Sequence, residues 1–186
     1  EPGLNVLPPG VERHVVNAGG LTGLQIFPDD EIEIINDEGN QIWEIVCFNK
    51  DGKSELGILS LKENNKYDFI KKILNSKDES SLATNYQLKK RNLDIKLSKS
   101  AIVFDIDTPS GERIKLKSKD KSYVIFAAPQ NNMLISEQNP SSDLTIFIKR
   151  SKIKNDKELA VIPDPVYEPS YEKNIDKQTS ISYQVK

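Results

Sequence analysis

Short segments in which polar and apolar residues alternate recur along this chain, and they constrain its fold more than any other feature. Residues 31–36 read Glu-Ile-Glu-Ile-Ile-Asn. Further strand-length segments, rich in β-branched and aromatic side chains, lie at residues 41–48, 101–106, 114–116, 123–126 and 144–148. A period of two is typical of strands that bury one face. Strands spaced by roughly ten residues predict a mostly β chain, an antiparallel β-sandwich or barrel with one or two short helices.

Turn-forming residues separate these segments. Asp37-Glu38-Gly39-Asn40 lies between the first two, Asn49-Lys50-Asp51-Gly52-Lys53 follows them, and Asp107-Thr108-Pro109-Ser110-Gly111 precedes residues 114–116. Glycine supplies positive φ angles and proline fixes its own φ, so both suit tight turns. The first of these turns predicts that residues 31–48 form a hairpin.

Helical spacing is clear only in residues 65–76, where Tyr67, Ile70 and Leu74 fall on one face. Residues 82–93 predict a second, weaker helix.

The composition changes after Arg150. Residues 151–179 are rich in Lys, Asp, Glu, Pro and Asn, which predicts an extended linker. Residues 180–186 alternate like a strand, with no partner after it. We therefore expect a compact β domain over residues 1–150, a linker over 151–179, and in 180–186 the first strand of a following domain. The start at Glu1, without Met, also predicts a fragment or a processed chain.

Charge and composition exclude several functions. The 186 residues hold 26 Lys+Arg against 28 Asp+Glu, a net charge of −2, which argues against nucleic-acid or anionic-membrane binding through bulk charge. No apolar run reaches the about 18 residues of a membrane span. Cys47 and His14 are the one cysteine and the one histidine, so an intrachain disulfide and a zinc finger are excluded. The cysteine usage predicts a cytoplasmic protein.

Other clusters fit structural roles better than chemical ones. The acidic residues 29–33 lack the spacing of a calcium loop, and Asp105 with Asp107 is typical of a solvated strand end. Cys47, within an apolar strand, indicates a buried and inert thiol. The glycines of residues 19–23 indicate a turn, because no phosphate-loop Lys-Ser/Thr follows them.

Two short motifs carry a family resemblance. Asp37-Glu38-Gly39-Asn40-Gln41 with Phe48-Asn49, and Asp105-Ile106-Asp107-Thr108, resemble the strand ends and turns of the urea-carboxylase-associated protein family. This resemblance covers about residues 10–150.

A closer resemblance is to the N-terminal region of bacterial aminomethyltransferases, in which copies of this domain precede a folate-binding glycine-cleavage T-protein module. It rests on Ala127-Ala128-Pro129, Asn139-Pro140, residues 143–150 and, for a second copy, residues 182–186. It implies a non-catalytic N-terminal accessory domain without a cofactor of its own, tetrahydrofolate being bound only by the missing downstream module. The implied partner is the remainder of the parent polypeptide, and homo-oligomer formation is left open.

The chain departs from the family's catalytic members at two places. Those members carry a His-Asp pair after Asp-Thr-x-Gly and a Cys-Asp further on. Here these places read Gly111-Glu112-Arg113-Ile114 and Ala127-Ala128-Pro129-Gln130. The departures imply no catalytic residue and no metal ligand. The alternative is a small-molecule-binding or deiminase/hydrolase-like domain for a guanidine- or urea-related compound, with Asp107, Glu112 and Arg113 in its pocket.

Overall fold

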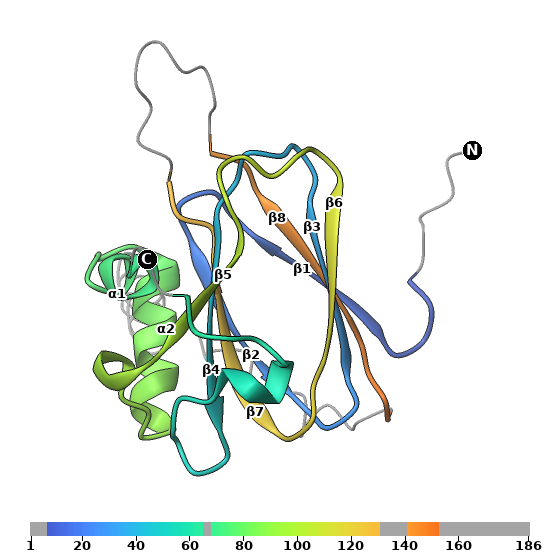
Figure 1. Cartoon of the computed structure of the whole chain (residues 1–186). Coiled ribbons are helices and arrows are strands. Elements are labelled where there is room, and N and C mark those ends of the chain that lie inside the picture. The colour runs from blue at the N-terminus through green and yellow to red at the C-terminus, as the bar shows by residue number, and fades with distance from the viewer. Residues whose placement is uncertain (1–6, 65–67, 131–140, 153–186) are drawn as a thin grey trace, which may run out of the picture.

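The computed structural model describes residues 7–64, 68–130 and 141–152, and within them the chain folds into two antiparallel sheets of four strands each (Figure 1). One sheet has the strand order β1-β8-β3-β6, and we call it the front sheet. The other has the order β2-β7-β4-β5, and we call it the helix-side sheet because the two α-helices pack on it. This confirms the predicted mostly β class and the sandwich. The elements are β1 (Val11–Val16), β2 (Leu21–Ile26), β3 (Glu31–Asn36), β4 (Trp43–Asn49), η1 (Leu56–Leu59), α1 (Phe69–Leu74), α2 (Glu79–Lys90), η2 (Ile95–Leu97), β5 (Ser100–Phe104), β6 (Glu112–Lys117), β7 (Ser122–Ala127) and β8 (Leu144–Lys149).

Consecutive strands mostly change sheets, which is the strand order of a jelly roll. The predicted hairpin over residues 31–48 is therefore wrong, because β3 pairs with β6 and β8 whereas β4 pairs with β5 and β7. The chain crosses between the sheets at residues 37–42. Gln41 holds this crossing: its buried amide donates to the Pro129 carbonyl at 2.8 Å and accepts from the Ser142 amide at 2.9 Å.

The helices cover one face of the sandwich. α1 and α2 lie on the helix-side sheet (Figure 1), and Ile70, Leu74 and Leu88 pack there against a buried cluster that includes Phe48 and Ile125. The front sheet carries no described helix on its outer face.

Of the two expected helices, the one predicted as weaker is the longer. α2 spans 12 residues against six in α1. It begins before its apolar residues because Asp78 caps it, accepting a hydrogen bond from the Ser81 amide at 2.9 Å. A capped start supplies stability that the apolar spacing does not reveal.

The main core lies between the sheets. Trp43 is completely buried there, with its ring centroid 5.6 Å from Phe126 and 6.3 Å from Phe104. Offset and edge-to-face ring pairs at these distances are favourable. Trp43 is therefore a core residue.

One buried arginine ties the end of β8 to β1 and to the turn before β3. The Arg150 side chain is 5% exposed. It donates from Nε and Nη2 to the two Glu12 carboxylate oxygens at 2.7 and 2.8 Å, and from Nη1 to Asp30 at 2.7 Å. Burial raises the pKa of Glu12, but hydrogen bonds from His14 and Arg150 outweigh it and lower that pKa to about 2.

The structure describes nothing beyond residue 152. The predicted linker over residues 151–179, apart from its first two residues, and the predicted strand over 180–186 therefore stay predictions. Within the described ranges, no helix is long and apolar enough to cross a membrane.

Candidate functional site

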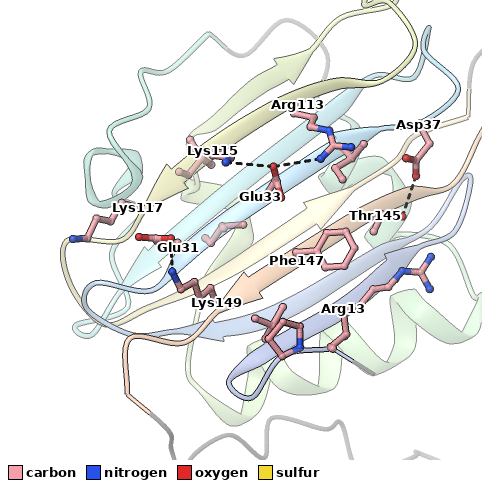
Figure 2. A pocket seen from close by; sticks show the side chains of 16 residues that line it. Arg13, Glu31, Glu33, Asp37, Arg113, Lys115, Lys117, Thr145, Phe147 and Lys149 are labelled. Atoms are coloured by element: carbon pink, nitrogen blue, oxygen red, sulfur yellow. Dashed lines mark hydrogen bonds and ion pairs between the residues drawn. The ribbon is translucent and has the colours of Figure 1, made fainter. Parts of the chain in front are cut away.

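The outer face of the front sheet holds an open hollow of about 930 Å³ (Figure 2). Strands β1, β8, β3 and β6 form its floor, and Leu7 and Pro8, just before β1, line its edge. Alternation along each strand sends every second side chain outward, so this face presents side chains that the core does not use.

Strand pairing arranges those side chains in rows across the sheet. Phe147 lies opposite Arg13 on one side and opposite Glu33 on the other, and Glu33 lies opposite Lys115. A parallel row places Glu31 between Lys149 and Lys117. The third row runs through Val15, Thr145, Ile35 and Arg113. The register thus builds a charged surface around a central aromatic ring.

Positive charge exceeds negative charge in the hollow. Its lining includes five cationic side chains and three carboxylates, which are Arg13, Arg113, Lys115, Lys117 and Lys149 against Glu31, Glu33 and Asp37. This excess of two contrasts with the net charge of −2 of the whole chain.

Three ion pairs in the hollow are loose, whereas Lys117 lies 3.0 Å from Asp29, which does not line it. Arg113 and Lys115 each approach Glu33 at 3.7 Å, and Lys149 approaches Glu31 at 3.7 Å (Figure 2). These distances exceed those of good hydrogen bonds. The cationic side chains are also exposed, Lys115 at 80%. Such pairs contribute little to stability, so these cations can turn toward another partner at small cost.

Arg13 is the cation best placed to bind something else. It is exposed, and within the described ranges no carboxylate forms an ion pair with it. It stands beside the half-buried ring of Phe147 (Figure 2). Thr145, two residues before Phe147 on β8, donates from Oγ1 to the Asp37 carboxylate at 3.1 Å (Figure 2). An anionic group that reaches Arg13 would therefore also contact an aromatic surface.

The three predicted binding residues are not all brought together. Arg113 lines the hollow, whereas Glu112, its neighbour on β6, faces the opposite side of the strand by alternation. Asp107 is exposed in the turn between β5 and β6 and does not line the hollow. A binding role for these residues stays a prediction.

Neither Arg13 nor Phe147 was predicted from the sequence as a site residue. The available signal was the alternation of residues 144–149, which sets Phe147 on the same face as Thr145 and Lys149. Aromatic residues are enriched in protein interfaces, so an outward-facing aromatic residue among polar ones is a candidate contact residue. Arg13 lies opposite Phe147 because β1 pairs with β8. These two strands are more than 120 residues apart in the chain, so the sequence alone does not show this pair.

The acidic residues 29–33 are matched by cations rather than gathered around a metal. Asp30 binds the buried Arg150, and Asp29 lies 3.0 Å from Lys117. Among the residues that the structure describes, no group of three or more His, Cys, Asp or Glu could hold a metal ion.

Among the residues that the structure describes, no basic side chain activates Cys47. It is buried in the core, and burial raises the pKa of its thiol to about 12, so the thiol is protonated at neutral pH. His14 lies on the front sheet, where Nε2 contacts Glu12 at 3.1 Å. The two residues stand on different sheets, so they form no catalytic dyad.

Comparison with known proteins identifies one relative that spans the whole chain. No family model matches this chain. Trimethylamine-oxide aldolase of Ruegeria pomeroyi is 30% identical over 186 residues, which is 100% of this chain and 23% of that protein. The chain thus spans about a quarter of the length of the curated relative that it matches. Among solved structures, a DUF1989 family protein from Silicibacter pomeroyi covers 88% of this chain and 87% of its own, with 9% identity and a TM-score of 0.45, too low to establish a shared fold.

The relative corrects the function predicted from the sequence. That prediction, an accessory domain of a folate-dependent aminomethyltransferase of the glycine-cleavage T-protein type, is wrong, because the relative that spans the whole chain is named as an aldolase of trimethylamine oxide. The alternative, a deiminase or hydrolase of guanidine-like compounds, is overturned by the same finding. The expectation that a downstream module binds tetrahydrofolate depended on the aminomethyltransferase prediction and is no longer supported. The motifs behind it were only a few residues long, too short to separate related multidomain proteins.

Proposed function

We propose that this chain is a β-sandwich domain of a longer enzyme that splits trimethylamine oxide or a closely similar methylated amine oxide. The observation that carries the proposal is 30% identity to trimethylamine-oxide aldolase along all 186 residues. The match includes both sheets and the helices, so the shared part is a whole folding unit rather than a local motif.

The chemistry follows from the substrate. An aldolase reaction releases an aldehyde, and every carbon of trimethylamine oxide belongs to a methyl group, so that aldehyde is formaldehyde. Atom balance leaves dimethylamine as the second product. One C–H bond, one C–N bond and the N–O bond break, while the C=O bond of formaldehyde and the N–H bond of dimethylamine form. The N-oxide supplies the oxygen, the proton from the methyl group ends on the nitrogen, and no external oxidant is needed.

The test uses the full-length polypeptide that carries this chain. We expect it to release formaldehyde from trimethylamine oxide and not from trimethylamine, because the amine has no oxygen to transfer. Trimethylamine is the matched control, with the same methyl groups. Equal formaldehyde from both, or none from the N-oxide, contradicts the proposal.

A further inference from the structure

The two sheets differ in what covers their outer faces. The outer face of the helix-side sheet is buried beneath α1 and α2. The outer face of the front sheet has no described helix over it, although it carries Phe147 and the 41%-exposed Val15. Aromatic residues and arginine are enriched in protein interfaces, so Phe147 beside Arg13 is a suitable anchor.

We propose that this face docks against an acidic surface of the same longer polypeptide, in the part that lies outside this chain. The inference rests on the proposed function, which makes the chain a domain of such a polypeptide. A protein the length of the curated relative has more than three quarters of its residues outside this region.

The charge of the hollow favours an acidic protein surface as its binding partner. The hollow has an excess of two positive charges, so a second copy of the same face would meet like charges. A nucleic acid would bring phosphates against Glu31, Glu33 and Asp37. An acidic protein surface with an apolar side chain at its centre matches both the cations and the ring of Phe147.

The loose ion pairs favour this docking. Arg113 and Lys115 share one carboxylate at 3.7 Å, so each can bond a partner carboxylate without leaving Glu33 uncompensated. Docking thus replaces solvent-exposed pairs with less exposed ones, and its strength depends on salt.

The test measures how fast a thiol on this face is alkylated in native protein. Lys115→Cys places the thiol in the hollow and Lys89→Cys, the matched control, places one on the exposed side of α2. Cys47 is fully buried and adds no background from this chain. Each variant is made in the 186-residue chain and in the full-length polypeptide. Maleimide labelling of the two peptides is followed by mass spectrometry, and Trp43 emission confirms native folding.

A face that is docked nine-tenths of the time reacts about tenfold more slowly, because the rate scales with the open fraction. We expect this slowing at position 115 in the full-length polypeptide only, with unchanged rates at position 89, and we expect 1 M salt to reverse most of it. The proposal is overturned if position 115 reacts at the same rate in both proteins, or if positions 115 and 89 are slowed equally. It is also overturned if salt does not reverse the slowing. Slowing in the isolated chain that grows with its concentration overturns it in favour of a second copy. Thiol rates do not depend on turnover, so this result is separate from the formaldehyde assay.

Discussion

Replacing Arg150 by methionine is the sharpest test of how this sandwich is held together. The arginine is 5% exposed and neutralises two carboxylates, Glu12 and Asp30, of which Asp30 is 1% exposed. Methionine keeps an apolar stem of similar length but removes all the donors. Arg150→Met therefore leaves Asp30 buried without its cation.

The expected cost is large for one side chain. Removing one partner of a buried ion pair costs about 3–5 kcal/mol. The pKa of Glu12 has the same sign: hydrogen bonds from His14 and Arg150 outweigh the effect of burial and lower it from 4.5 to about 2. A loss of about 3 kcal/mol lowers the melting temperature of a chain of this size by roughly 10 °C.

Urea unfolding followed by the emission of Trp43, the one tryptophan and fully buried, measures this loss. Arg13→Met is the matched control, because Arg13 is exposed, and it should change the free energy of unfolding by no more than about 0.5 kcal/mol. If Arg150→Met lies within about 1 kcal/mol of that control, the buried network is not what secures β8.

The same network sets the acid stability. The folded pKa of Glu12 lies below its ordinary value, so its contribution is present above pH 4.5 and is lost as the pH falls toward about 2. The Arg150→Met chain should lose less stability over that interval than the wild type, and an identical loss in the two would count against this account.

Further substitutions test other contacts. Burial raises the pKa of Glu44, so the ionisation of its carboxyl group weakens the fold as the pH rises above 4.5. Glu44→Gln should therefore flatten the fall of the urea-unfolding free energy with rising pH, and an unchanged slope refutes this. A Cβ on Gly23 would clash with the Tyr123 hydroxyl, so Gly23→Ala should cost about 1–3 kcal/mol of unfolding free energy. Gly57→Ala, with nothing within 4 Å of its Cβ, should be nearly neutral, and equal effects of the two substitutions contradict the packing. Cys47 should resist aromatic disulfide reagents in native protein and react after unfolding in urea; rapid native labelling would show that its burial is wrong.

The strands of this fold could be read from local alternation, but their partners could not. Residues 31–36 and 144–148 were found because a period of two marks a half-buried strand wherever it pairs. The hairpin over residues 31–48 failed because a turn-like sequence also suits a crossing between sheets, and the bonds of Gln41 that fix the crossing reach Pro129 and Ser142. Strands β1 and β2 were not predicted, because neither Val11–Val16 nor Leu21–Ile26 alternates regularly between apolar and polar residues.

The candidate site could be predicted only one residue at a time. Arg113 was singled out from its own neighbourhood in the sequence, yet its surroundings in the hollow come from β1, β3 and β8. Likewise the bonds of Arg150 to Glu12 and Asp30 span more than 100 residues of the chain. A single sequence carries no information on such pairs until the strand order is known.

The most direct test of the central claim, that this chain belongs to an enzyme splitting trimethylamine oxide, is a product balance by proton NMR. The full-length polypeptide is incubated with trimethylamine oxide in the absence of oxygen. Because the N-oxide supplies the oxygen atom, we predict one dimethylamine for each formaldehyde, with no added oxidant. Absence of both products, or products that form only when oxygen or another oxidant is added, would contradict the claim.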